Sequence, residues 1–213
     1  MLESLTMGLG QELSFTPNFF VDPDDNQVLN LAYPHLFDEE YIRSEIRLEI
    51  GPIAEWTPSH LVEIRSMAAE QYERVFEHPT TTVLTIDVER TFWEKATILH
   101  KIAHFPEGKR LPLRYARHYY DLYKMSMSPI KQSAFGRKDL LERDILFKTK
   151  FYYSRNASYD TASLRPPPER LIPEIRSDYD RMKNMIYGAK PDFTVLMEGI
   201  AALEEEIHRL STK

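Results

Sequence analysis

The chain has 213 residues, with 42% hydrophobic and 28% charged residues, no cysteine and a formal net charge of −6 at pH 7. This length allows one large domain or two small ones with a buried core. The lack of cysteine excludes disulfides and thiolate metal sites and suits a reducing cytoplasm. No apolar run approaches the ~20 residues that a membrane span needs, and residues 1–5 lack the basic start of a signal peptide.

The charge is divided along the chain. Residues 1–89 carry 4 Lys and Arg against 17 Asp and Glu, whereas residues 90–155 carry 15 against 6 and residues 156–213 carry 8 against 10. A basic middle segment of this kind can face phosphates. It can equally neutralise the acidic front of the chain across a shared interface, and the charge counts leave both interpretations open.

The front of the chain has the alternating pattern of strands. Residues 42–50 are the clearest example, because even positions carry mainly Ile and Leu while Arg43, Glu45, Arg47 and Glu49 lie on the other face. A weak helical spacing of leucines covers residues 1–13, and an Asp-rich turn makes a hairpin of the first two strands. Strands are expected at residues 18–21, 27–33, 42–50, 61–65 and 80–86, with a short helix through Val75.

The remainder of the chain has the pattern of helices. Asp87 is expected to be the N-cap of a helix that ends near His104, before Pro106 and Gly108. Further helices are expected at about 114–127, 138–152, 168–188 and 192–210. The sequence therefore predicts an α+β fold, with a small sheet of about four strands over residues 1–87 and a helical bundle over residues 88–213.

Lys95 is the first candidate functional residue. It lies inside the predicted helix between apolar Phe92 and Leu99, in a segment rich in aromatics. An ammonium group in this position can bind phosphate. The same spacing is also typical of a lysine whose stem covers apolar surface while its charged end reaches solvent.

Asp121 is the second candidate, and Tyr120 is the aromatic residue beside it. Arg114 and Arg117 precede Asp121 at i−7 and i−4, on one helical face. A carboxylate held by arginines beside an aromatic ring could bind a nucleotide, with Tyr120 stacking on the base and Arg117 near the phosphates. The alternative is an ordinary Arg117–Asp121 ion pair on the surface.

Metal sites are suggested more weakly. Glu45 and Glu49 alternate on one strand face and could offer oxygen ligands to Mg²⁺, or they could form ion pairs on an exposed face. His100 and His104 have helical metal-ligand spacing but no accompanying zinc-peptidase motif. The acidic segment 22–25 lacks the glycine and distal glutamate of a calcium loop and is predicted to be a turn.

Three blocks of the sequence resemble a known family. Residues 90–97 (Arg-Thr-Phe-Trp-Glu-Lys-Ala-Thr), 117–123 (Arg-His-Tyr-Tyr-Asp-Leu-Tyr) and 178–188 look like the C-terminal two-thirds of AbiEii/AbiGii toxin family nucleotidyltransferases. Residues 21–25 and 46–51 fit the same pattern, so the resemblance covers nearly the whole chain. The family is similar to DNA polymerase β-type nucleotidyltransferases and includes toxins of bacterial toxin–antitoxin and abortive-infection systems. Some members add nucleotides to tRNA 3′ ends.

The resemblance implies roles for three residues. Lys95 would bind the phosphate of the nucleoside triphosphate (NTP) substrate, Asp121 would complete the pocket, and Glu49 would be the strand acid that binds metal. The implied cofactor of the complete enzyme is Mg²⁺. The implied partners are a cognate antitoxin and a tRNA or protein acceptor, in the cytoplasm and not at a membrane, and a homodimer is also expected.

The sequence departs from the family at one important place. The family begins with a Gly-Gly-Thr turn and a strand bearing Asp-x-Asp, which hold two Mg²⁺ ions and the triphosphate. No segment of this chain matches that block, and His118 stands where the family has an acidic residue. Two-metal transfer needs at least two clustered carboxylates. We therefore expect a truncated or split protein that binds nucleotide weakly or not at all and does not transfer it by itself.

The sequence is also compatible with two other functions. The first is a non-catalytic interaction module, a decayed or split toxin that binds an antitoxin or a partner chain. The second is a helical nucleic-acid-binding protein, which rests only on the basic segment 90–155 and would show strongly salt-dependent binding of RNA.

Overall fold

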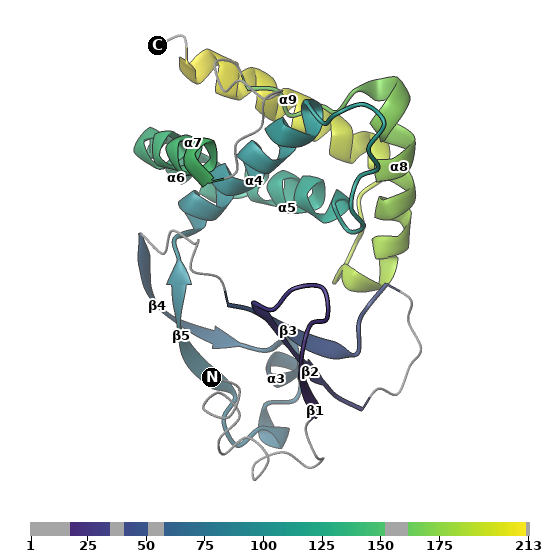
Figure 1. Ribbon diagram of the computed structural model, residues 1–213. Coiled ribbons are helices and arrows are strands. Elements are labelled where there is room, and N and C mark those ends of the chain that lie inside the picture. Colours follow the sequence, from purple (N-terminus) through teal and green to yellow (C-terminus); the bar gives the residue numbers. More distant parts are fainter. Residues whose placement is uncertain (1–17, 35–40, 51–57, 152–161, 212–213) are drawn as a thin grey trace. The chain divides into compact units, whose positions relative to one another are not determined.

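The structure is a computed structural model that describes residues 18–34, 41–50, 58–151 and 162–211. The chain forms two compact units (Figure 1). The first, here the sheet unit, comprises Met1–Ala54 and Arg181–Gly188, and the second, the helical unit, comprises Glu55–Asp180 and Ala189–Lys213. The boundary that the sequence suggested, between residues 87 and 88, lies inside the helical unit. The α+β class is confirmed.

The sheet unit contains a three-stranded antiparallel sheet in the order β1-β2-β3. The strands are β1 (Asn18–Val21), β2 (Val28–Ala32) and β3 (Glu45–Glu49). The turn between β1 and β2 is built as the sequence predicted: Asp22 Oδ1 accepts the Asp24 N–H at 3.0 Å, and Asp25 Oδ1 accepts the Gln27 N–H at 3.0 Å. Strand β3 is shorter than predicted because its pairing with β2 covers only five residues.

A second, two-stranded sheet belongs to the helical unit. Its strands β4 (Ser59–Arg65) and β5 (Thr80–Ile86) are antiparallel and pair over seven residues. Helix α3 (Met67–Gln71) and the 3-10 turn η1 (Glu73–Val75) connect them, and Ser66 Oγ caps α3 by accepting the Ala69 N–H at 3.0 Å. The prediction of one sheet with about four strands was therefore wrong, because the five described strands form two separate sheets.

The helices account for most of the helical unit. They are α4 (Val88–Ala103), α5 (Ala116–Ser126), α6 (Ile130–Phe135), α7 (Lys138–Phe151), α8 (Pro168–Arg181) and α9 (Phe193–Ser211). Helix α6 was not predicted. The predicted helix 168–188 was too long: α8 ends at Arg181, the 3-10 turn η2 (Met182–Met185) follows, and Gly188 adopts a φ of +82°.

Asp87 stands at the N-cap position of α4, as predicted, but its side chain makes no capping hydrogen bond to the helix backbone. Its Oδ1 instead lies 2.7 Å from His60 Nδ1 on β4. The carboxylate therefore connects the β4–β5 hairpin to the start of α4 within the helical unit.

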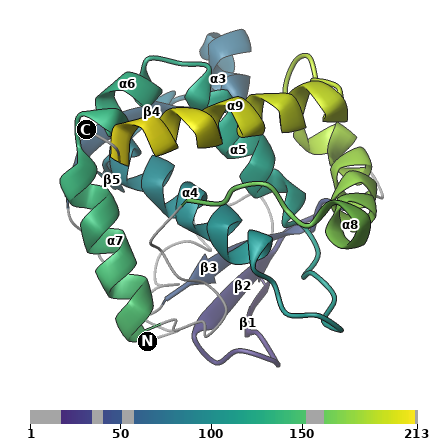
Figure 2. The same cartoon turned by 90° about the horizontal axis from the view of Figure 1, so that it is seen from above.

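Helix α4 is the centre of the helical unit. It packs against α5, α6 and α7, and Figure 2 shows it between α7 and α5. Phe92, Trp93 and Leu99 are buried on it. Trp93 stacks on Phe135 with ring centroids 6.1 Å apart, and its Nε1 donates to the Ala134 carbonyl at 3.0 Å. These contacts hold the short helix α6, which at six residues is too short to be stable alone.

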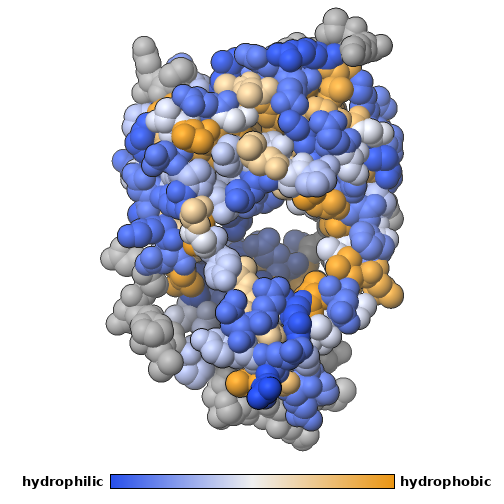
Figure 3. Space-filling view, turned by 180° about the vertical axis from the view of Figure 1, so that it is seen from behind, coloured by the Kyte–Doolittle hydropathy of each residue, from blue (hydrophilic) through white to orange (hydrophobic). Residues whose placement is uncertain are grey.

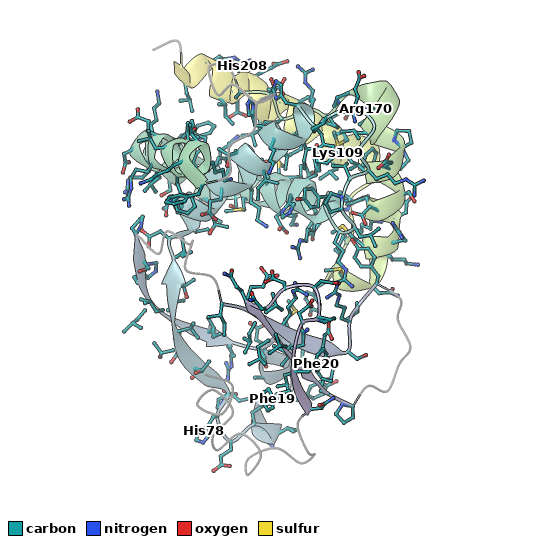
Figure 4. All side chains as sticks on the ribbon, viewed as in Figure 1. Phe19, Phe20, His78, Lys109, Arg170 and His208 are labelled. Carbon is teal, nitrogen blue, oxygen red and sulfur yellow. The ribbon has the colours of Figure 1, made fainter. Side chains whose placement is uncertain are left out.

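Close contacts also fix α5 and α8. Gly199 on α9 lies against the Tyr123 ring of α5, and a Cβ atom at residue 199 would come within 2.5 Å of that ring. Arg170 on α8 donates to the carbonyls of Pro106, at 3.0 Å, and Phe105, at 2.5 Å, beyond the end of α4 (Figure 4). These contacts hold α9 against α5, and α8 against the segment that follows α4.

Hydrophilic residues cover much of the helical unit on the face shown in Figure 3, with hydrophobic residues in separate patches. In the described part of the chain, no helix combines the length and apolar character that crossing a membrane requires.

Candidate functional site

Lys95 and Asp121 meet where α4 packs against α5. The Lys95 Nζ donates to Asp121 Oδ2 at 2.7 Å and lies 3.3 Å from His118 Nδ1. The side chains of Lys95 and Asp121 are 20% and 38% exposed. The structure therefore brings the two candidate residues together in a pair that solvent can reach.

The ion pair of Asp121 differs from the one that the sequence suggested. Its partner is Lys95 from the neighbouring helix, whereas the local spacing pointed to Arg117. Arg114 is also placed differently, because α5 begins only at Ala116 and Arg114 has a left-handed φ of +69°. The predicted helical relation between Arg114 and Asp121 is therefore absent.

His118 is buried beside this pair and remains uncharged. Burial, followed by the positive charges of Lys95, Arg117 and Lys148, lowers its pKa from 6.5 to about 3. The Lys95 ammonium can only donate, so Nδ1 of the neutral ring is the acceptor and Nε2 carries the proton. His118, at which the resemblance led us to expect an acidic residue, thus contacts Lys95 directly.

The low pKa of His118 predicts a pH-dependent stability. Between pH 6.5 and about 3 the unfolded chain binds a proton at this position and the folded chain does not, so stability falls as the pH falls. Asparagine keeps an acceptor near the Nδ1 position and cannot be protonated. For His118→Asn we expect the slope of unfolding free energy against pH, measured by urea denaturation between pH 6 and 4, to decrease by about 1.4 kcal/mol per pH unit. Equal slopes for the two proteins would contradict a buried neutral His118.

Tyr120 lies next to the pair on α5 and is half-buried. Burial and the negative charge of Asp121 raise its pKa, so the phenol stays protonated at neutral pH. An uncharged aromatic ring near the Asp121 carboxylate can stack on a base.

A buried network of charged and polar side chains holds the turn of α4 that contains Lys95. Asp144 on α7 is fully buried, and its carboxylate lies 3.3 Å from the Arg90 guanidinium, 3.3 Å from Lys148 Nζ and 2.5 Å from Thr97 Oγ1. Lys148 also donates to the carbonyl of Glu94 at 3.1 Å, the residue before Lys95. We name Arg90, Thr97, Asp144 and Lys148 the Asp144 network.

Burial lowers the pKa of Lys148, although the negative charges of Asp144 and Glu94 oppose this effect. Sequence reasoning missed the network. One signal was present, because Asp144 follows buried Leu140 by four residues and therefore lies on the inward face of the predicted helix.

Glu49 belongs to the sheet unit, and Lys95 and Asp121 belong to the helical unit. The Glu49 side chain is 73% exposed and accepts from Arg47 Nε at 3.1 Å.

The other ion pairs of the sheet unit also involve β3 and its neighbours. Arg47 donates to Asp22 Oδ2 at 2.6 Å. Hydrogen bonds from the Asp24 backbone and from Asn30, together with the Arg47 charge, lower the pKa of Asp22. Glu45 pairs with Arg43 at 3.2 Å, so the polar face of β3 carries ion pairs.

The residues that the structure describes do not form a metal site. Among the described residues, no three His, Cys, Asp or Glu side chains are grouped so that they could hold a metal ion. The rings of His100 and His104 have centroids 4.5 Å apart. His100 Nδ1 accepts the Ser163 N–H at 3.1 Å, and His104 Nδ1 lies 2.9 Å from the His100 carbonyl.

The sequence matches the family model described as "Nucleotidyl transferase AbiEii toxin, Type IV TA system" over residues 5–205. No curated protein gives a significant match, and no solved structure does so. The family match spans most of the chain and includes both Lys95 and Asp121. The chain therefore belongs to the AbiEii nucleotidyl transferase toxin family of type IV toxin–antitoxin systems.

Proposed function

We propose that the chain binds an NTP at the Lys95–Asp121 pair, as part of a toxin that transfers a nucleoside monophosphate to RNA, such as tRNA, or to a protein. The observation that carries this proposal is the 2.7 Å contact between Lys95 Nζ and Asp121 Oδ2, on two helices and open to solvent. A neighbouring carboxylate fixes the position of the ammonium group before a phosphate arrives.

Each residue has a definite part in the proposal. Lys95 binds phosphate, Asp121 accepts from a hydroxyl or a base edge, Arg117 adds a cation near the phosphates, and Tyr120 stacks on the base. Arg117 is exposed on α5. Mg²⁺ is proposed as the metal of the transfer reaction, with Glu49 as a ligand. The described residues do not provide a complete site for it, so we assign it no step.

The proposed partners follow from the family. A type IV toxin–antitoxin description supports a cognate antitoxin as partner and the bacterial cytoplasm as location. A homodimer also remains a proposal. Exposed strands such as β4 and β5, whose Leu61 and Leu84 are 69% and 56% exposed, are surfaces at which chains associate.

The test is to measure binding and transfer on the same protein. Each of the four NTPs is titrated by calorimetry, and a second sample is incubated with labelled NTP, Mg²⁺ and pooled tRNA. We expect saturable NTP binding. Label on tRNA would establish the enzyme and contradict our expectation that this chain is inactive alone. A chain that neither binds NTP nor labels tRNA would contradict the proposal.

An interaction module is the alternative function. Lys95 and Asp121 already satisfy each other, and Glu49 is bonded to Arg47, which favours a folded chain that does no chemistry. For this function we expect the antitoxin encoded beside the toxin to copurify with the chain, and Lys95→Met to leave the complex intact. A complex that needs Lys95 would favour the nucleotide site.

A further inference from the structure

The first turn of α5 is capped from a distant part of the chain. Asp178 on α8 is buried, and its two carboxylate oxygens accept backbone N–H groups at that end of α5: Oδ1 from Arg114 at 3.0 Å and Oδ2 from Ala116 at 2.9 Å. The first N–H groups of a helix have no partner within the helix. The residue at the N-cap, Tyr115, makes no side-chain capping bond, so Asp178 supplies the cap.

The chain enters α5 through an uncommon backbone conformation. Arg114 has a φ of +69°, a left-handed conformation that few residues other than glycine adopt. Asp178 accepts the N–H of this residue and of the residue two positions later. The carboxylate therefore stabilises a turn that the local sequence does not favour.

The candidate nucleotide site depends on where α5 begins. Arg117, His118, Tyr120 and Asp121 lie within the first two turns of this helix, whereas Lys95 comes from α4. We propose that Asp178 is a positioning residue of this site, which sets the start of α5 so that His118 and Asp121 meet Lys95. The inference rests on the proposed function for its nucleotide readout only.

Glu204 provides a matched control. It is a buried carboxylate on α9 that also accepts two backbone N–H groups, both at Oε2, from Leu164 at 2.5 Å and from Arg165 at 3.1 Å, while Oε1 accepts from Arg165 Nε at 2.8 Å. The segment that it holds is also bonded to His208, whose Nε2 lies 2.6 Å from the Ala162 carbonyl (Figure 4). This segment carries none of the candidate residues.

The experiment compares Asp178→Asn with Glu204→Gln. Asp178→Asn replaces one carboxylate oxygen with an amide nitrogen and removes one backbone hydrogen bond. Glu204→Gln makes the same chemical change at a buried carboxylate, where the amide nitrogen takes the place of Oε1 and removes the bond from Arg165 Nε. The first readout is the ¹⁵N spectrum of the His118 ring, which reports its tautomer and its contact with Lys95 without any nucleotide. The second readout is NTP affinity by calorimetry.

For Asp178→Asn we expect the His118 Nδ1 signal to shift and NTP affinity to fall about fivefold. A fivefold loss is the size of effect that corresponds to the net contribution of about one hydrogen bond. For Glu204→Gln we expect an unchanged His118 signal and less than about a twofold change. An unchanged His118 signal in Asp178→Asn, or equal shifts in both variants, would overturn the proposal. If the wild-type chain binds no NTP, the proposed function fails while the His118 readout still decides the role of Asp178.

A rescue variant keeps the test decisive if Asp178→Asn folds poorly. Glycine adopts a φ of +69° freely, so Arg114→Gly should reduce the need for the carboxylate. We expect the double variant Arg114→Gly/Asp178→Asn to recover part of the wild-type His118 signal. No recovery in a folded double variant would show that Asp178 does not act through this turn.

Discussion

Replacing Lys95 with methionine is expected to weaken NTP binding by roughly 10- to 100-fold, the range for loss of one hydrogen bond to a charged group. The Nζ of Lys95 is 2.7 Å from Asp121 and 3.3 Å from His118, so its position is fixed before any ligand arrives. Methionine keeps much of the length of the stem and removes the charge together with its N–H donors. The measurement is calorimetric titration with the best-bound of the four NTPs.

Lys101→Met is the matched control, because Lys101 lies on the same helix and is exposed. We expect its affinity for NTP to stay within about twofold of wild type. Asp121→Asn separates the two halves of the site: it frees the Lys95 ammonium, so pyrophosphate should bind at least as tightly while NTP binds more weakly. Equal losses in the Lys95 and Lys101 variants would show that only net charge matters.

Asp144→Asn is expected to destabilise the folded chain by about 3–5 kcal/mol, the cost of removing one partner from a buried ion pair. Asp144 and Arg90 have fully buried side chains, and Lys148 is only 17% exposed. Both cations lie 3.3 Å from this one carboxylate. Without it they stay buried beside a neutral amide. The measurement is the free energy of unfolding by urea at pH 7.

Asp139→Asn is the control for this prediction, because Asp139 lies on the same helix α7 and also pairs with an arginine. Arg137 and Asp139 are 42% and 56% exposed, so the variant should have almost the same stability as wild type. Replacing Arg90 and Lys148 with methionine in the Asp144→Asn background should recover part of the loss, since no unpaired charge then remains buried. Similar stabilities for the two single variants would contradict the burial of the network.

Local patterns predicted most of the elements, but they did not predict the contact between Lys95 and Asp121. The helical spacing of Phe92, Leu99 and Ile102 correctly indicated α4, because these residues are buried along one face of it. The aromatic segments around Lys95 and Asp121 pointed to two helices with one charged residue each, and these residues are in contact. The family resemblance, which the family match confirms, was needed to pair them.

The features that the sequence did not predict depend on partners far along the chain. Asp144 meets Arg90 across 54 residues, and Asp178 caps Ala116 across 62. A local sequence pattern covers only a few residues, so it cannot reveal partners that are this far apart along the chain. Helix α6 was missed because its six residues are held by Trp93 from another helix. The division into two sheets was missed because strand pairing is set by tertiary structure rather than by alternation.

The sheet unit is assembled from two separate stretches of chain, which limits how the protein can be divided. A single cut after Ala54 would leave Arg181–Gly188 inside the helical fragment without the rest of its unit. That stretch packs with the sheet unit and not with the helical unit, so the cut would remove its packing partners. A soluble helical fragment should therefore need a short polar linker that joins Asp180 directly to Ala189. For the same reason, recombination at one breakpoint cannot transfer the sheet unit to another protein, and only a paired exchange of both stretches would move it intact.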